Sequence, residues 1–209
     1  MTNKSSEKTF VGHLGTKALT STHPEIKKLK RQGIEAEIHG NKVWRSSYVI
    51  MDYFEDYPLP NGQKVMDIGC GWGLTGIYLA SRFDAKVLGI DADENVKPFL
   101  DAQARVNKTP IAFEKKTFQQ IKKKDMAGYH TLVGADICFW DELVEPLFKL
   151  VKRAMNAGVK QVLIADPGRS PYWELVERCT DEFSGSAQVT RSISKPYRTT
   201  KEILIVKPG

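Results

Sequence analysis

The feature that most constrains the fold is an apolar run followed at once by a glycine-dense turn. Residues 65–76 read Val-Met-Asp-Ile-Gly-Cys-Gly-Trp-Gly-Leu-Thr-Gly, which predicts a buried strand, a turn and the start of a helix. Glycines in the turn allow positive φ and close approach of the backbone to a ligand, and exposed N–H groups point at that ligand. Residues 71–76 also satisfy the dinucleotide pattern G-x-G-x-x-G. The run therefore predicts a nucleotide-like ligand and leaves its class open.

Apolar strands alternate with helical stretches from residue 64 onward. This order predicts an α/β fold with a mostly parallel sheet, helices on both faces and ligands at the carboxyl ends of the strands. Residues 188–193 and 202–206 also read as strands, but their link is too short for a crossover helix, so we expect an antiparallel hairpin. The earlier strands are expected at 64–68, 86–90, 111–114, 131–135 and 160–165, and the helices at 74–82, 94–106, 142–157 and 171–182.

The first 43 residues differ from the rest, and we predict an N-terminal appendage over 1–43 ahead of a domain over 44–209. A Ser/Thr-rich stretch ending in Pro24 precedes residues 25–29, which predicts a capped short helix. Apolar and acidic side chains alternate over residues 34–38, which is typical of a strand, and residues 39–42 predict a hairpin turn into a strand at 43–44. Residues 46–57 have helical spacing of apolar side chains and predict a helix.

Length and composition exclude several classes of protein. The chain of 209 residues suits one domain with a substantial core, and it contains no apolar run near the ~18 residues that cross a bilayer. Its start is polar, so we expect a cytoplasmic protein. Three widely spaced cysteines and four scattered histidines predict neither a disulfide framework nor a metal site. The formal charge of +6 indicates a solvated basic surface or an acidic protein or nucleic-acid partner, and no RNA-binding signature is present.

Asp67, two residues before Gly69, together with the terminal hairpin, makes the chain similar to class I, seven-strand methyltransferases that use S-adenosyl-L-methionine (SAM). A dinucleotide fingerprint usually has an apolar residue at the place of Asp67. The resemblance covers residues 64–209 and implies a Rossmann-like seven-stranded sheet, with SAM as cofactor and S-adenosyl-L-homocysteine as product. In this family the acid helps to position the amino acid end of SAM, through a charge-assisted hydrogen bond. The resemblance places the cofactor around Gly69, Cys70, Gly71, Trp72 and Gly73.

Further cofactor contacts are expected after the next two strands. Asp91, followed by Ala92, ends the second strand, where an acid accepts hydrogen bonds from ribose hydroxyls in both NAD and SAM enzymes. Asp93 suits either helix capping or a cofactor contact. Relatives place an acid or amide before an aromatic residue after the third strand; here no acid precedes Phe118, which packs either on the adenine or in the core. Trp72 either lies over the cofactor, with a cation–π contact to the sulfonium, or caps the helix.

The acceptor side is expected after the fourth strand, at residues 136–139. Their sequence, Asp-Ile-Cys-Phe, resembles the Asp-x-x-Tyr/Phe signature of a branch of protein lysine methyltransferases, and Trp44 fits the Trp that this branch carries ahead of the glycine motif. The resemblance implies that Asp136 and Phe139 are catalytic and that Trp44 and Asp136 contact the cofactor; the alternative for Asp136 is capping of the following helix. Residues 165–169, Ala-Asp-Pro-Gly-Arg, are similar to a segment of the lysine methyltransferases that act on the electron-transfer flavoprotein beta subunit. Arg169 there either meets an acidic substrate group or belongs to a tight turn.

Methyl transfer from a sulfonium is a direct displacement, so the enzyme chiefly aligns donor, methyl and acceptor. A lysine amine has a pKa of about 10.4, and a carboxylate beside it raises that pKa, so Asp136 is an orienter or a temporary proton acceptor rather than an activator. We predict a SAM-dependent methyltransferase that N-methylates a protein side chain, lysine. The alternatives are a small-molecule N- or O-methyltransferase, a catalytically silent SAM-fold interaction subunit and a nicotinamide oxidoreductase.

Overall fold

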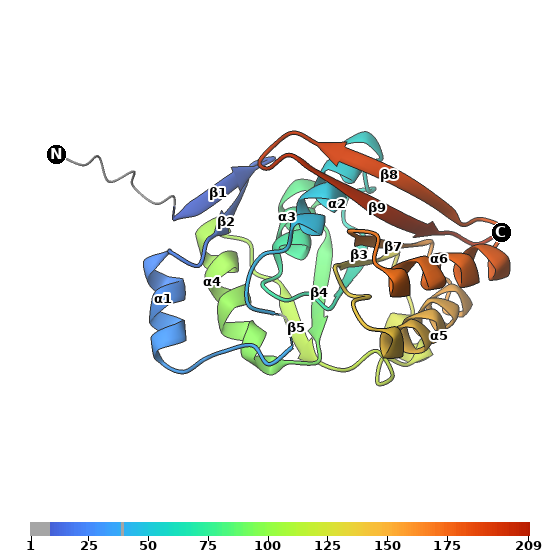
Figure 1. Ribbon diagram of the computed structural model, residues 1–209, viewed down its shortest axis with the longest axis horizontal. Coiled ribbons are helices and arrows are strands. Elements are labelled where there is room, and N and C mark those ends of the chain that lie inside the picture. The colour runs from blue at the N-terminus through green and yellow to red at the C-terminus, as the bar shows by residue number, and fades with distance from the viewer. Residues whose placement is uncertain (1–8, 39) are drawn as a thin grey trace.

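A seven-stranded sheet forms the centre of the computed structural model, which describes residues 9–38 and 40–209 (Figure 1). The strand order is β5-β4-β3-β6-β7-β9-β8, in which β5, β4, β3, β6 and β7 run parallel and β9 is antiparallel to both neighbours. The strands are β3 (Lys64–Ile68), β4 (Lys86–Asp91), β5 (Ala112–Lys115), β6 (Thr131–Ala135), β7 (Gln161–Asp166), β8 (Ala187–Ile193) and β9 (Thr199–Val206).

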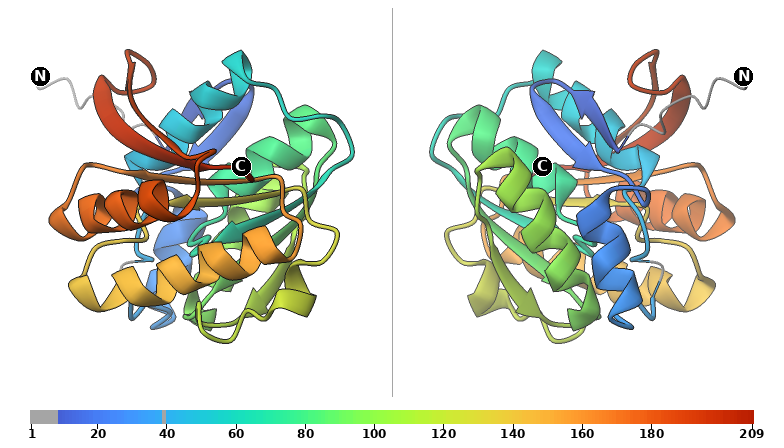
Figure 2. Two further views of the ribbon diagram at one scale, coloured as in Figure 1. Left: turned by 90° about the vertical axis from the view of Figure 1, so that its right-hand side faces the viewer. Right: turned by 90° about the vertical axis from the view of Figure 1, so that its left-hand side faces the viewer.

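Helices cover both faces of the sheet (Figure 2). They are α2 (Arg45–Asp56), α3 (Leu74–Phe83) and α4 (Lys97–Asn107) on one side and α5 (Val144–Asn156) and α6 (Ser170–Glu182) on the other, with short 3-10 turns η1 (Glu94–Val96), η2 (Lys123–Met126) and η3 (Asp141–Leu143). Side chains of β3 alternate between the two cores: Val65 packs with α2 and α3, and Met66 and Ile68 pack with α5 and α6. None of the described helices has both the length and the apolar character that crossing a bilayer requires.

The alternation predicted from the sequence is confirmed: the core elements lie within a few residues of their expected bounds, and the tail is an antiparallel hairpin. The parallel register matters for the site. Asp67 of β3 lies opposite Gly89 of β4 and Val133 of β6, so the carboxyl ends of three adjacent strands meet at one edge. The residues that follow these strands are therefore brought together although they are far apart in the chain.

The N-terminal region differs from the prediction in one respect. The short helix is present as α1 (Pro24–Arg31), and its N-cap, His23, accepts from the Glu25 N–H. The prediction of a hairpin between residues 34–38 and 43–44 is wrong, because neither stretch forms a strand. Residue 39 of the expected turn lies outside the described residues. The hairpin is formed earlier, by β1 (Phe10–His13) and β2 (Thr16–Leu19).

Two backbone groups between β2 and α2, those of Glu37 and Gly40, bond to side chains of the domain and not to a partner strand. The Glu37 N–H donates to Asp93 Oδ2 over 2.6 Å, and the carbonyl of Gly40 accepts from the Trp72 indole over 2.7 Å. Further back, Leu19 exchanges two buried hydrogen bonds with the Gln103 amide of α4. The N-terminal residues therefore pack on the domain, while the boundary at 43/44 stays a prediction.

The bond between Trp72 and Gly40 offers a test of this attachment. Trp72→Phe keeps a ring to stack on Phe99 but leaves the buried Gly40 carbonyl without its donor, which costs about 1–3 kcal/mol. We expect faster amide hydrogen exchange in residues 40–44 with little change in the sheet. Trp173→Phe, at an exposed site on α6, is the control. Unchanged exchange in residues 40–44 of the Trp72 variant would contradict the attachment.

Candidate active site

A cavity of about 290 Å³ lies where the carboxyl ends of β3, β4 and β6 meet. Its lining combines the glycine turn, the residues after β4, β5 and β6, and the N-terminal segment around residues 38–44. The residues predicted to be catalytic or to bind the cofactor all line this one cavity, namely Trp44, Asp67, Gly69, Cys70, Gly71, Trp72, Gly73, Asp91, Ala92, Phe118, Asp136 and Phe139. Asp93 and Arg169, for which the sequence left two roles open, are not part of its lining. The roles of the lining residues stay predictions, but their assembly at one place is a property of the fold.

The turn after β3 needs glycine for two different reasons. Gly69 has φ +64°, and a Cβ there would lie 2.6 Å from Cγ2 of Ile137, so the neighbouring loop packs directly on its backbone. Gly71 has φ +51°, and a Cβ there would meet no atom within 4 Å. Its N–H donates to Asp91 Oδ2 over 2.9 Å. The turn is thus fixed in a left-handed conformation and leaves open space beside Gly71.

Asp67 and Asp91 place two buried or partly buried carboxylates under this turn. Asp67 is 2% exposed, and its Oδ2 accepts from the Gly76 N–H over 3.0 Å. Burial raises the pKa of Asp67 to about 7, and burial also raises the pKa of Asp91. Asp91 accepts from the N–H groups of Gly71 and Asp93. Within the described part of the chain, no basic side chain forms an ion pair with either carboxylate, so both can still accept from a ligand.

Trp72, Cys70 and Asp93 also have structural roles beside the cavity. The Trp72 ring stacks on Phe99 at 5.0 Å and its indole N–H donates to Gly40, so it ties the N-terminal segment to the turn and does not cap α3. A contact of Trp72 with a sulfonium stays a prediction. Burial raises the pKa of the Cys70 thiol well above its usual value, so this thiol is neutral and fills space. Asp93 caps η1 by accepting from Asn95 N–H, which confirms the capping interpretation.

Asp136 is held in place at both carboxylate oxygens. Its side chain is 3% exposed, and its backbone has φ +58°, a conformation that residues other than glycine adopt at an energetic cost. Oδ2 accepts from the Ser46 N–H over 3.4 Å, in the first turn of α2, and Oδ1 accepts from Arg169 Nη1 over 3.2 Å. Asp136 therefore caps α2, whose N-cap residue Trp44 has no side-chain cap of its own, and does not cap the following helix.

Arg169 lies between two carboxylates of the protein itself. Its Nη1 donates to Asp166 Oδ2 over 2.6 Å as well as to Asp136. Asp166 Oδ1 accepts from the N–H groups of Gly168 and Arg169, which confirms the tight turn after β7. Burial raises the pKa of Asp166, and the guanidinium opposes this shift. An external acidic group as partner of Arg169, the other alternative, finds no support because its guanidinium already bonds two internal carboxylates.

Aromatic side chains line the side of the cavity beyond Asp136. The Phe139 ring meets the Trp140 ring edge to face, with 4.6 Å between centroids. Both side chains line the cavity, and Trp140 is 50% exposed. Phe139 and half-exposed Trp140 therefore give this part of the cavity wall an aromatic surface that reaches solvent.

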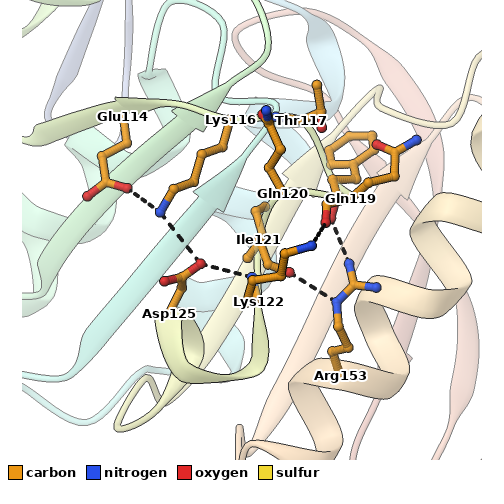
Figure 3. Close-up of polar contacts among 10 residues, drawn as sticks. Glu114, Lys116, Thr117, Gln119, Gln120, Ile121, Lys122, Asp125 and Arg153 are labelled. Atoms are coloured by element: carbon orange, nitrogen blue, oxygen red, sulfur yellow. Dashed lines mark hydrogen bonds and ion pairs between the residues drawn. The ribbon is translucent and has the colours of Figure 1, made fainter.

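The loop after β5 contributes residues that sequence reasoning missed. Lys116, Thr117 and Gln119 line the cavity beside Phe118. Figure 3 shows how the loop is fixed: Arg153 of α5 donates to the Ile121 carbonyl, and Lys116 Nζ lies between carboxylates of Glu114 (2.7 Å) and Asp125 (3.5 Å). The Gln119 carbonyl accepts from Lys122 Nζ over 2.9 Å. Gln119, which directly follows Phe118, thus adds an amide residue to the cavity lining, and no motif in the sequence marks it.

A family model described as lysine methyltransferase matches residues 24–172. The chain belongs to this lysine methyltransferase family. The match begins at α1 and ends within α6, so it includes all strands whose carboxyl ends form the cavity.

Two curated relatives illustrate the range of this similarity. Phosphoethanolamine N-methyltransferase 3 of Arabidopsis thaliana is 31% identical over 120 residues, which are 57% of this chain and 24% of that protein. The electron transfer flavoprotein beta subunit lysine methyltransferase of Homo sapiens is 25% identical over 133 residues, which are 62% of this chain and 49% of that protein. The matched part thus spans about a quarter of the first relative and about half of the second.

Solved structures agree with the family membership at the level of the fold. The ribosomal protein L11 methylase from Lactobacillus delbrueckii subsp. bulgaricus aligns with a TM-score of 0.58 at 15% identity, over 79% of each chain. The precorrin-6y C5,15-methyltransferase from Geobacter metallireducens aligns with a TM-score of 0.59 at 10% identity, over 78% of this chain and 87% of that one. At these identities the chains share the Rossmann-like methyltransferase fold.

The lysine methyltransferase family and this fold imply SAM as the methyl donor. The cavity fits that group. SAM has an ammonium and two ribose hydroxyls that donate hydrogen bonds, and Asp67 and Asp91 have acceptor capacity left for such donors. The space beside Gly71 has no side chain in it, which leaves room for an extended ligand along the turn.

The raised pKa of Asp67 predicts a pH-dependent effect on stability. Asp67 titrates near 3.8 when exposed and near 7 in the folded protein, so the penalty for ionising it grows between these pH values and is fully present above pH 7. Asp67→Asn removes the penalty and keeps an acceptor for Gly76. We expect its Tm to exceed that of the parent by about 5 °C or more at pH 8 and by much less at pH 4.5.

Thermal unfolding at the two pH values measures this difference, with Asp101→Asn, at a partly exposed ion pair on α4, as the matched control. An equal change in Tm at both pH values would contradict the burial of a titrating Asp67 carboxylate.

Proposed function

We propose that this protein is a SAM-dependent N-methyltransferase whose acceptor is a lysine side chain of a protein. The observation that carries the proposal is the meeting of Asp67, Asp91 and Asp136 with the glycine turn in one cavity. The first two carboxylates would accept hydrogen bonds from a donor-rich ligand, and the third lines the same cavity as Phe139 and Trp140. SAM and an alkylammonium are both cationic, so a cavity with three carboxylates attracts donor and acceptor alike.

Each part of the cavity has a role in this proposal. Asp67 would hold the ammonium of SAM, Asp91 the ribose hydroxyls, and the backbone at Gly71 the adjoining part of the ligand. Phe118 and the Gln119 amide would contact the adenine, with a flat apolar surface and a hydrogen-bonding group respectively. SAM supplies an electrophilic methyl group on a sulfonium. The protein then contributes alignment, which is worth ~7–11 kcal/mol in well-oriented reactions.

Asp136 favours nitrogen over oxygen as the acceptor atom. A carboxylate attracts an ammonium and orients an amine by accepting its N–H, whereas it repels the anionic form that an oxygen acceptor reaches as it reacts. Phe139 and Trp140 would enclose the aliphatic stem of a lysine while its nitrogen lies near Asp136. These two features together match the chemistry of a lysine side chain.

A small amine is the second candidate acceptor, supported by the N-terminal segment. Ile38, Gly40, Lys42 and Val43 line the cavity, so this segment covers part of the site, and a covered site suits a small substrate. The similarity to phosphoethanolamine N-methyltransferases points the same way. Trp140, which lines the cavity and is half exposed, favours the protein acceptor.

Isotope-labelled SAM, incubated with the protein and a lysate of its source cells, identifies the acceptor by mass spectrometry. We expect label on lysine residues of protein, with transfer reduced at least about 100-fold in Asp136→Asn, since that change removes the charge beside the acceptor. Asp101→Asn should transfer at the parent rate.

Label found only in small amines would favour the second candidate. SAM binding without any transfer would indicate a silent interaction subunit. Asp136→Asn that methylates at the parent rate would remove Asp136 from the reaction.

A further inference from the structure

The Arg169 guanidinium bridges two buried carboxylates through one nitrogen. Nη1 lies 3.2 Å from Asp136 Oδ1 and 2.6 Å from Asp166 Oδ2. The two carboxylate side chains are 3% and 0% exposed, and the Arg169 side chain is 30% exposed. Within the described residues, no second basic side chain forms an ion pair with either acid. Arg169 is therefore the cation on which both buried charges depend.

The position of Arg169 is fixed by the same acid that it pairs with. Asp166 ends β7, and its Oδ1 accepts from the N–H groups of Gly168 and Arg169, so the arginine backbone is bound to the end of the strand. Asp136 is also tied to β7, because its N–H donates to the Ala165 carbonyl over 2.8 Å. Backbone and side-chain bonds thus join the ends of β6 and β7 into one rigid unit.

The charge of this unit is not balanced within it. Asp136 and Asp166 contribute two negative charges and Arg169 one positive charge, which leaves one negative charge beside the cavity. The Ser46 N–H, at the start of α2, offsets part of it. An acceptor ammonium beside Phe139 and Trp140 would neutralise the remaining negative charge. Without Arg169, the same place would hold two carboxylates with no positive charge to neutralise either of them.

We propose that Arg169 is a positioning residue for the acceptor: held by Asp166, it fixes the Asp136 carboxylate in one orientation and leaves a single negative charge to receive one ammonium. The inference rests on the proposed function. It also decides between the two roles considered for Asp136. Because Oδ1 accepts from the guanidinium and Oδ2 accepts from the Ser46 N–H, the carboxylate is fixed in place, and we assign it the orienting role and not that of proton acceptor.

Methyl transfer to the acceptor nitrogen requires the loss of one proton from nitrogen and the breaking of the carbon–sulfur bond. Water takes one proton from the acceptor ammonium, and the freed nitrogen lone pair forms the bond to the methyl carbon. The carbon–sulfur bond breaks, and its electron pair stays on sulfur, which becomes a neutral thioether. The product amine then carries the positive charge, and it remains paired with Asp136 until it leaves.

The test uses calorimetry with SAM and methyl transfer from labelled SAM to protein of a heat-treated lysate of the source cells. Arg169→Met should bind SAM within about twofold of the parent and lower kcat at least about tenfold, while Arg169→Lys, which keeps the charge, recovers most of the rate. Arg178→Met, on the same helix in a surface ion pair with Glu145, should match the parent. If Arg169→Met does not fold, the double variant Arg169→Met with Asp166→Asn keeps the net charge and should show the same loss of kcat.

Three results would overturn the inference. If Arg169→Met, or the double variant tested in its place, transfers methyl at the parent rate, then Asp136 needs no positioning by Arg169. The proposed function would stand in that case. Equal losses of SAM affinity and kcat in Arg169→Met, without recovery in Arg169→Lys, would show that Arg169, Asp136 and Asp166 only stabilise the fold. A parent protein that binds no SAM or transfers no methyl would remove the proposed function, and the inference with it.

Discussion

Carboxylates held out of water at the ends of parallel strands are the constraint on which this structure depends. A buried charge is costly unless hydrogen bonds stabilise it, and here backbone N–H groups supply these bonds. Asp67 accepts from Gly76 in the first turn of α3, and Asp136 accepts from Ser46 in the first turn of α2. Asp91 accepts from Gly71 within the turn itself. Each acid therefore orients a helix start or a turn, and each remains at the wall of the cavity.

The two ends of the cavity are built differently. At the glycine turn, Trp72 joins the N-terminal segment to the domain through its stack on Phe99 and its bond to Gly40, so this end is covered. At the other end, Arg169 stabilises the acid, and aromatic side chains lead to solvent. A covered end suits a cofactor that is bound throughout the reaction, and an open end suits an acceptor that must enter and leave. In the proposed function, the methyl donor would occupy the end at the glycine turn and the acceptor the end beside Asp136.

Sequence reasoning succeeded where local pattern and topology act together. Asp67, Asp91 and Asp136 each follow or end a predicted parallel strand, and a parallel sheet brings such positions to one edge, so their assembly could be predicted. Contacts between distant segments could not. The bond from Ser46 to Asp136 joins residues 90 positions apart, and no local pattern encodes it. Residues 34–38 misled because their alternation is typical of a strand. In the structure, Asp93 of the β4–η1 turn instead accepts from the Glu37 N–H, and Trp72 of the glycine turn donates to the Gly40 carbonyl.

Titration calorimetry distinguishes SAM from a dinucleotide as the ligand of the glycine turn, Asp67 and Asp91. We expect one SAM bound per chain, no measurable binding of NAD, and an affinity for SAM at least about tenfold lower in Asp91→Asn, where one ribose acceptor is weakened. Glu94→Gln, an exposed neighbour in η1, should bind SAM as the parent does. No heat with SAM, or NAD bound as tightly as SAM, would show that the glycine turn is not a SAM site.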